Sequence, residues 1–349
     1  MCHFQQEKLI IIIILIICYN KSNKKIHQTL QIKSRPKISI FLPTYNKEKY
    51  IRKAINSIQN QTLQDIEIIA VNDCSNDETL EILKNLSLTD KRIKIVNNKN
   101  NSGLLYSRAM GIIHSSGEYL MNLDPDDELY NSDNLEYLYN ISNTWNVDII
   151  EFNYYINSIK KNINVCKKFN KIIRKPNLFE SIYNDDNTIR DVLITNKLIK
   201  REILYKAYEL FYSYIYRDKW NYHEDNIWSI LVHKLAASKL CIKKLIYIYN
   251  DDANKKSLMK DIGSLFEFKN YIYRFDMIRH ILNNTIYSKY LLEECIAYIE
   301  RLQYSKNFRK FNELNEEFKK KTISFLKTCI KFKKISEYYK EFIIKEIKI

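Results

Sequence analysis

The chain has 349 residues, which is long enough to bury a full catalytic core and to carry a further region beside it. Its net charge of +15 favours anionic partners, and residues 301–349 contribute to it with 14 Lys and Arg against 6 Asp and Glu. The 7 cysteines are scattered and never form a CxxC pair, which argues against a disulfide framework and against a cysteine zinc site.

The first feature in chain order is an isolated apolar run at Leu9–Tyr19. As a helix it would rise about 16 Å, less than the roughly 30 Å of a bilayer core. The basic residues Lys21, Lys24 and Lys25 follow it, which is the wrong flank for a luminal catalytic domain. No small-residue cleavage site stands out after it. We therefore expect a membrane-associated protein with a retained N-terminal anchor; a secretory signal is the alternative, and the side of the membrane stays open.

Strands and helices are expected to alternate after the polar spacer that follows this run. Lys37–Leu42 has the composition of a strand, and the next segment has the spacing of one helix face. Its apolar positions are Ile51, Ala54, Ile55 and Ile58. Further strands are predicted at Ile66–Val71 and Ile93–Val96, with a helix between them that opens near Ser75 or Asp77.

The next predicted strand, which begins at Tyr119, ends in a cluster of acids. Residues two apart on an extended backbone project from the same side, so Asp124 and Asp126 can present two carboxylates to one point. Hard oxygen ligands of this kind suit Mg²⁺ or Mn²⁺. The alternative is a solvated turn in which Asp126 or Asp127 caps the following helix.

The alternation of strands and helices predicts an α/β domain with a mostly parallel, doubly wound sheet. In such sheets ligands bind beyond the carboxyl ends of the strands, where the acids fall. Later in the chain we expect a strand at Val147–Phe152, helices at 190–204 and 224–239, and a strand end at Tyr247–Tyr249. Residues 258–349 are expected to form an all-helical appendage.

Taken in order, the motifs at the strand ends resemble glycosyltransferase family 2, the inverting nucleotide-sugar transferases of GT-A fold. The motifs are Pro43-Thr44-Tyr45-Asn46 with Glu48, Val71 to Asp77, Asn101-Ser102-Gly103 through Arg108 and Gly111, and Gly117-Glu118-Tyr119 leading to the acids. Segments similar to the family's later landmarks are Asn196 to Arg201 and His223-Glu224-Asp225. The resemblance implies a GT-A domain at 37–257, between an N-terminal segment of 1–36 and a basic helical region of 258–349. Cys74 departs from the pattern, because the family usually has glycine there.

The resemblance implies a set of residues that bind the nucleotide-sugar. These are Pro43, Thr44, Tyr45, Asn46, Glu48, Asp73, Arg108, Asp124 and Lys197. Asp73 would accept the N3–H of uracil, or else form a turn or cap a helix. Arg108 would lie near the base or the phosphates, or else be an exposed helix arginine. Lys197 would neutralise phosphate, or else be solvated.

The resemblance also implies the metal site and the catalytic residues. Asp124 and Asp126 fit the family's DXD pattern, in which Mn²⁺ or Mg²⁺ bridges the donor phosphates, and Asp127 would be a third ligand through water or a contact to the sugar. Asp225 would be the general base for the acceptor hydroxyl, with Glu224 in reserve. The alternative for this pair is that the two acids stabilise a helix N-terminus.

The expected function is metal-dependent, inverting transfer of a sugar from a nucleotide-sugar, preferably a UDP-sugar, to a hydroxyl of a glycan or glycolipid. The expected partners are the donor, a glycan or lipid-linked acceptor and a membrane, and no nucleic acid. One alternative is a nucleotidyltransferase on a related sheet, although its glycine-rich phosphate loop is missing near the first strand. The other is a non-enzymatic basic module that binds RNA or acidic membranes through the C-terminal helices.

Overall fold

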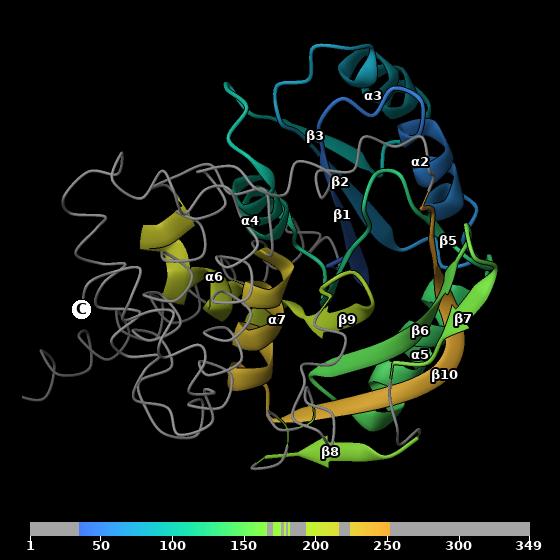
Figure 1. The fold of residues 1–349 in the computed structure, drawn as a ribbon, viewed down its shortest axis with the longest axis vertical. Helices are drawn as coiled ribbons and strands as arrows, with labels where there is room; N and C mark the ends of the chain where they lie inside the picture. Colours follow the sequence, from blue (N-terminus) through green and yellow to red (C-terminus); the bar gives the residue numbers. More distant parts are fainter. Residues whose placement is uncertain are drawn as a thin grey trace, which may run out of the picture. The chain divides into compact units, whose positions relative to one another are not determined.

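The computed structural model describes residues 35–165, 170–175, 178, 181, 193–215 and 224–251 of the chain. Apart from Arg35, these residues belong to one compact unit that begins at Pro36. Figure 1 shows its sheet and the helices around it. The predicted N-terminal hydrophobic run and the predicted helical region of 258–349 lie outside the described residues.

The prediction of a membrane-associated protein is contradicted. Within the described part of the chain, no helix combines the length and the apolar character that crossing a bilayer requires. We therefore withdraw the membrane localisation, noting that Leu9–Tyr19 is not among the residues described.

The first half of the sheet is parallel, as predicted. Its strands are β1 (Ile38–Thr44), β2 (Ile66–Asn72), β3 (Ile93–Asn97) and β4 (Tyr119–Asn122). They lie side by side in the order β3-β2-β1-β4, and each neighbouring pair is parallel. Because parallel strands point the same way, their carboxyl ends meet at one edge, which positions the acids that follow β4 beside the loops after β1 and β2.

The second half of the sheet is mostly antiparallel, so the prediction of a mostly parallel sheet is wrong for the whole. The remaining strands are β5 (Glu128–Leu129), β6 (Ile149–Ile156), β7 (Lys161–Ile163), β8 (Ile172–Arg174), β9 (Lys197–Lys200) and β10 (Ser238–Tyr249). The sheet continues from β4 through β9, β6 and β10 to β5. β9 runs antiparallel to both of its neighbours, whereas β6 and β10 are parallel to each other.

The positions of strands β9 and β10 show that two helices were predicted with the wrong bounds. The segment predicted as a helix at 190–204 contains the strand β9, and α6 (Arg201–Ile215) begins only after it. The helix predicted at 224–239 is α7 (Glu224–Leu235), and its last residues belong to β10. Short apolar runs have no period that separates a strand from a helix, so sheet pairing decided these boundaries.

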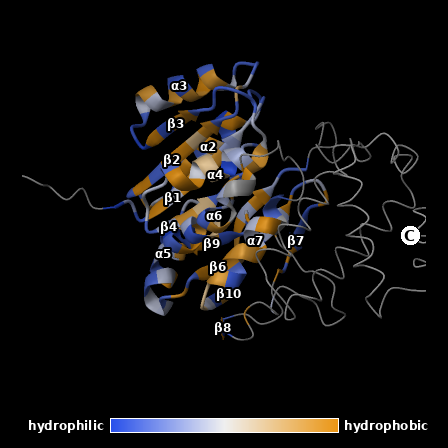
Figure 2. Ribbon diagram, turned by 90° about the vertical axis from the view of Figure 1, so that its left-hand side faces the viewer, coloured by the Kyte–Doolittle hydropathy of each residue, from blue (hydrophilic) through white to orange (hydrophobic). Residues whose placement is uncertain are grey.

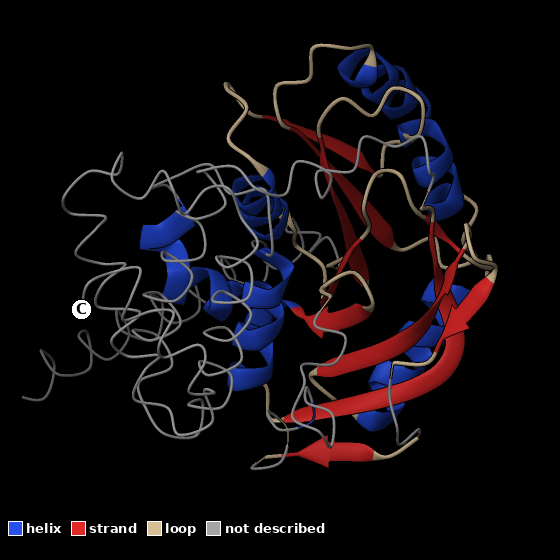
Figure 3. Ribbon diagram, viewed as in Figure 1, coloured by secondary structure: helices blue, strands red, loops and turns tan. Residues whose placement is uncertain are grey.

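Helices cover both faces of the sheet (Figures 1 and 3). The other helices are α2 (Ile51–Gln59), α3 (Thr79–Thr89), α4 (Leu104–His114) and α5 (Asn134–Trp145). One core contains residues of α2, α3 and α5, and the other contains residues of α4, α6 and α7. Figure 2 shows hydrophobic residues along the strands between them.

Alternate side chains of strand β1 belong to the two different cores. Ile38, Ile40 and Leu42 face the core with α2, whereas Phe41 faces the core with α4, as the two-residue period of a strand requires. Gly111 allows the close approach of α4 to β1, because a Cβ there would lie 2.7 Å from Cδ2 of Phe41. This contact places the helix that carries Arg108 against the middle of the sheet.

Candidate functional site

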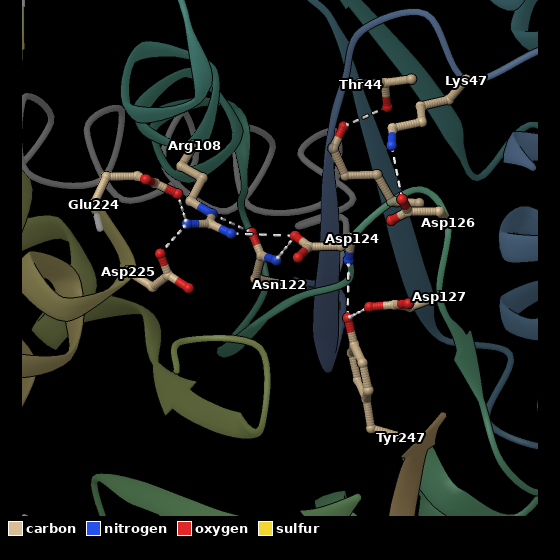
Figure 4. A network of polar contacts seen from close by, with 11 residues as sticks. Thr44, Lys47, Arg108, Asn122, Asp124, Asp126, Asp127, Glu224, Asp225 and Tyr247 are labelled. Atoms are coloured by element: carbon tan, nitrogen blue, oxygen red, sulfur yellow. Dashed lines mark hydrogen bonds and ion pairs between the residues drawn. The ribbon is translucent and has the colours of Figure 1, made fainter. Parts of the chain in front are cut away.

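Arg108 is the centre of a group of polar side chains at the carboxyl end of β4 (Figure 4). It lies on α4 and is 1% exposed, so the alternative of an exposed helix arginine is wrong. Its Nη1 lies 2.5 Å from Oε1 of Glu224 and 3.3 Å from Oδ1 of Asp225. Its Nη2 lies 3.2 Å from Oδ1 of Asp124, and its Nε donates to Oδ1 of Asn122 at 3.2 Å. We call these five residues the Arg108 cluster.

The charge of Arg108 is maintained by its neighbours. Burial by itself lowers the pKa of the guanidinium, but the charges of Asp225, Glu224 and Asp124 outweigh it, so the pKa is raised. A buried guanidinium is stable only when carboxylates satisfy its donors in this way. The cluster therefore joins α7 to the end of β4 through a single charged side chain.

Glu224 and Asp225 lie in the first turn of α7 but differ in their surroundings. The side chain of Glu224 is 2% exposed and that of Asp225 is 22% exposed. Burial raises the pKa of Glu224 to about 8, and the charge of Asp225 adds to the effect while Arg108 opposes it. At neutral pH Glu224 therefore holds a proton, while the Asp225 carboxylate is the more accessible of the two.

The acids after β4 lie in one segment, Leu123–Asp127, which we call the acid loop. Asp124 accepts a hydrogen bond from Nδ2 of Asn122 at 2.9 Å, and burial raises the pKa of its carboxyl while the Arg108 charge lowers it. Asp126 forms an ion pair with Lys47, whose Nζ lies 2.7 Å from Oδ2. The charge of Asp126 also raises the pKa of Asp124. The structure thus concentrates negative charge at this edge of the sheet.

Asp127 is held from β10. Its Oδ2 accepts a 2.5 Å hydrogen bond from the Tyr247 hydroxyl, and its Oδ1 accepts a 2.8 Å bond from the main-chain nitrogen of Asn250. Burial raises the pKa of Asp127 well above its usual range, with the charges of Asp126 and Asp124 as further causes. Both oxygens of Asp127 therefore have partners from the chain itself.

Asp73 ends β2 and holds the loop that leads into α4. Its Oδ1 accepts bonds from Nδ2 of Asn98 and from the main-chain nitrogen of Ser102, both at 2.9 Å. Its Oδ2 accepts from the main-chain nitrogen of Gly103 at 2.8 Å. Gly103 adopts a positive φ of 91° and directly precedes α4. Asp73 thus fixes the loop before α4 without capping the helix, whose N-cap has no side-chain hydrogen bond, and its binding of uracil stays a prediction.

The loops after β1 and β2 are joined by reciprocal contacts. The main-chain nitrogen of Asn46 donates to the Ser75 hydroxyl, and Oδ1 of Asn46 accepts from the main-chain nitrogen of Asn76. Glu48 makes a similar exchange, since its main-chain nitrogen donates to Asp77 and its carboxylate accepts from the main-chain nitrogen of Glu78. Asn46 and Glu48, two of the predicted nucleotide-binding residues, therefore contact the loop that begins at Asp73, whereas Pro43 and Thr44 are buried in β1.

Cys74 adopts the conformation for which the family's usual glycine is suited. Its φ is 58°, in the left-handed region that side chains rarely adopt. Helix α3 begins later than the predicted Ser75 or Asp77, at Thr79, and the Asp77 carboxylate accepts from the main-chain nitrogen of Thr79 at 3.0 Å. The turn is thus kept despite the missing glycine.

The structure does not bring Lys197 to the Arg108 cluster. Lys197 is fully buried on β9, where its Nζ lies 3.2 Å from Oε1 of Glu151 and 2.6 Å from Oδ1 of Asn196. Glu151 also pairs with Lys239 at 2.9 Å. Burial alone would raise the pKa of Glu151, but the two lysines lower it to about 2. The solvated-lysine alternative is wrong, and the predicted contact of Lys197 with phosphate has no counterpart in these contacts.

A metal site was predicted at Asp124, Asp126 and Asp127. Across the described residues, no three or more His, Cys, Asp or Glu side chains are grouped as metal ligands would be. Asp127 uses both oxygens within the protein, whereas Asp124 and Asp126 face Arg108 and Lys47. A divalent cation prefers carboxylate oxygens that no other group of the chain already holds from both sides, so Asp124 and Asp126 fit such an ion better than Asp127 does.

Sequence reasoning missed four residues of this site. Lys47 directly follows the Pro43–Asn46 motif, and Asn122 ends β4 two residues before Asp124, so local spacing could have indicated both. Tyr247 and Asn250 are 120 or more positions from Asp127 and had no local signal. Only the position of β10 in the folded sheet reveals that these two residues lie beside Asp127.

Comparison with known proteins agrees with the resemblance seen in the sequence. A family model described as Glycosyl transferase family 2 matches residues 39–207. The chain is 29% identical over 221 residues to the uncharacterized glycosyltransferase EpsJ of Bacillus subtilis, covering 63% of this chain and 62% of that protein. It is 46% identical over 92 residues to an uncharacterized glycosyltransferase of Haemophilus influenzae, covering 26% of this chain and 28% of that protein. The chain thus spans less than two thirds of the length of these relatives.

Among solved structures, the chain is similar to S. aureus TarS 1-349 in complex with UDP-GlcNAc. The TM-score is 0.60 at 19% sequence identity, over 84% of this chain and 80% of that chain. A likeness at this level of identity shows a shared fold. The expected α/β sheet with flanking helices, of GT-A type, is therefore confirmed as a fold.

Proposed function

This chain belongs to glycosyl transferase family 2 through residues 39–207, and from this premise we propose that it transfers a sugar from a nucleotide-sugar to a hydroxyl group of an acceptor. The Arg108 cluster carries the proposal. It brings acids from α7 and from the end of β4 to one guanidinium, at the edge of the sheet where ligands bind in such folds. The relatives named as glycosyltransferases support the same activity.

Asp225 is the residue that we assign as general base. It is the more exposed of the two candidate acids, and its Oδ1 lies 3.3 Å from Nη1 of Arg108. Glu224, with a pKa of about 8, is neutral at pH 7 and adds no second negative charge beside it. These features rank two acids that the sequence alone left unranked.

In the proposed reaction, the acceptor hydroxyl oxygen forms a bond to the anomeric carbon of the donor sugar. The bond from that carbon to the donor phosphate breaks, and the nucleoside diphosphate leaves with the bonding electrons. The hydroxyl proton passes to Asp225. A single displacement of this kind inverts the configuration at the anomeric carbon.

We further propose that Asp124 and Asp126 hold Mg²⁺ or Mn²⁺. Both are hard oxygen donors, and their mutual repulsion would be relieved by a cation. When bound, the ion would supply Lewis-acid neutralisation of charge on the departing diphosphate. Lys47 pairs with Asp126 at 2.7 Å, so ion binding would require this ammonium to move.

A UDP-sugar is the donor that we propose. Asp73 lies at the end of β2, and its Oδ2, which accepts from Gly103, has a second lone pair for the N3–H of uracil. TarS is a fold neighbour that was solved with UDP-GlcNAc, which makes UDP-sugars the first donors to try. The acceptor that we propose is a hydroxyl of a glycan.

The test is release of nucleoside diphosphate from a panel of nucleotide-sugars, with and without Mn²⁺. Asp225→Asn should lower kcat by about 10²- to 10⁴-fold, because it removes the general base while keeping the shape of the side chain. Asp133→Asn, at an exposed ion pair with Lys244, is the matched control and should leave kcat unchanged. Release of pyrophosphate in place of a nucleoside diphosphate, or full activity of Asp225→Asn, would contradict the proposal.

A further inference from the structure

Tyr247, on β10, contacts the acid loop at two places through one hydroxyl group (Figure 4). Its oxygen accepts a hydrogen bond from the main-chain nitrogen of Asp124 at 3.3 Å. Its proton is donated to Oδ2 of Asp127 at 2.5 Å. The phenol therefore fixes both ends of the short segment Asp124–Asp127 relative to β10.

Asn250, directly after β10, adds two further hydrogen bonds to the same segment and one to Glu128, the first residue of β5. Its main-chain nitrogen donates to Oδ1 of Asp127 at 2.8 Å. Its side-chain Nδ2 donates to the main-chain oxygen of Asp126 at 3.1 Å and to Oε1 of Glu128 at 2.8 Å. These contacts hold the main chain at Asp126 and the side chains of Asp127 and Glu128.

The contacts are shielded from water. Asp127 is 1% exposed and Tyr247 is 2% exposed, so a broken hydrogen bond between them would not be replaced by solvent. A carboxylate with both oxygens engaged in this way is suited to orient a backbone. It is less suited to a role as ligand, because the side chain is buried and only one lone pair of each oxygen is left.

We propose that Asp127, Tyr247 and Asn250 act as positioning residues, together termed the β10 lock, which fixes the main chain of the acid loop. The lock sets the directions in which Asp124 and Asp126 present their carboxylates. The inference rests on the proposed function, because it assigns these two acids to the donor and its cation. It places Asp127 outside the ligand set that the DXD pattern implies.

The β10 lock predicts losses of kcat of different size for two conservative substitutions. Asp127→Asn keeps the shape of the side chain, and its amide can still accept from Asn250 and donate to the Tyr247 oxygen, so kcat should fall by less than about 10-fold. Asp126→Asn removes a carboxylate from the donor site and should lower kcat by about 10²-fold or more. Equal losses in these variants would overturn the proposal, since Asp127 would then itself be a ligand.

Tyr247→Phe tests the hydroxyl directly. It removes both contacts of the phenol, and we expect kcat to fall by about 10- to 100-fold and the half-saturating Mn²⁺ concentration to rise, as for other residues that orient metal ligands. Because the two residues act as one unit, the double variant with Asp127→Asn should lose about as much as Tyr247→Phe alone. Additive losses in the double variant would show separate roles and count against the lock.

The matched control is Tyr139→Phe. Tyr139 also donates its hydroxyl to a carboxylate, that of Glu118 at 3.1 Å, but the contact is exposed and lies before the first residue of β4, away from the acid loop. Its kinetics should match those of the unmodified protein. If Tyr247→Phe does not fold, Asn250→Ala replaces it, because it removes the two side-chain bonds and keeps the main-chain bond to Asp127.

Hydrogen–deuterium exchange provides a readout that does not depend on turnover. Tyr247→Phe should speed exchange of the amides of residues 123–129 at least about 10-fold, because the Asp124 amide loses its acceptor, whereas Tyr139→Phe should not. Faster exchange in a protein that transfers no sugar would leave the lock intact and refute the proposed function. Unchanged exchange together with unchanged kinetics in Tyr247→Phe would refute the lock and leave the proposed function intact.

Discussion

Replacing Glu224 by Gln should change how the stability of this protein depends on pH. Burial and the neighbouring Asp225 charge raise the pKa of Glu224 from 4.5 to about 8. The groups that face it are Arg108, whose Nη1 lies 2.5 Å from Oε1 of Glu224, and the Asp225 carboxylate beside it on α7. Between pH 4.5 and about pH 8 the folded protein therefore holds a proton at Glu224 that the unfolded chain has released.

The sign and the size follow from proton linkage. A raised folded-state pKa contributes stability that is fully present below pH 4.5 and is lost as the pH rises through about 8. With one extra proton bound, the slope is about 1.4 kcal/mol per pH unit, or about 5 kcal/mol over the whole window. Glutamine cannot titrate, so the variant should lack this slope.

The assay is urea unfolding followed by circular dichroism at several pH values from 5 to 8. The free energy of unfolding of Glu224→Gln should rise relative to that of the unmodified protein by about 1.4 kcal/mol for each pH unit. Glu136→Gln, the same change at an exposed position on α5, is the matched control. Parallel pH profiles for the unmodified protein and Glu224→Gln would show that Glu224 is ionised at neutral pH. The electrostatic reason for assigning Asp225 as the base would then be lost.

Further substitutions test other parts of the site and the fold. Arg108→Met leaves buried acids without their counter-charge, so thermal denaturation should show a loss of about 3–5 kcal/mol; an unchanged Tm would refute the role of the cluster. Lys47→Met removes the ammonium that pairs with Asp126, so calorimetric titration without donor should show Mn²⁺ binding about 2- to 5-fold tighter, and weaker binding would contradict the assigned site. Gly111→Ala would place a Cβ 2.7 Å from the Phe41 ring, so unfolding in urea should show a loss of about 1–3 kcal/mol, whereas a gain from helix propensity would show that α4 can shift.

The first half of the fold could be predicted because its signals are local. The apolar positions predicted for α2, such as Ile51 and Ile55, are buried on that helix, and the predicted strands from Lys37 to Val96 agree with β1, β2 and β3 within a few residues. A strand repeats every two residues and a helix about every 3.6, so a short window is enough to identify each of them. In the second half the predicted strand at Val147–Phe152 overlaps β6, but β9 lacked such a window, because it is short and lies between strands that are distant in the chain.

The candidate site likewise has one part that could be predicted from the sequence and one part that could not. The sequence by itself determined which acids follow β4 and predicted that ligands bind at their edge of the sheet, because side-chain direction along a strand and strand polarity are local properties. Only the tertiary structure decided that Arg108 pairs with Glu224, 116 positions away, and that Tyr247 and Asn250 hold Asp127. Those partners are chosen by how α7 and β10 pack against α4 and the acid loop, and residue spacing carries no information about contacts over such separations.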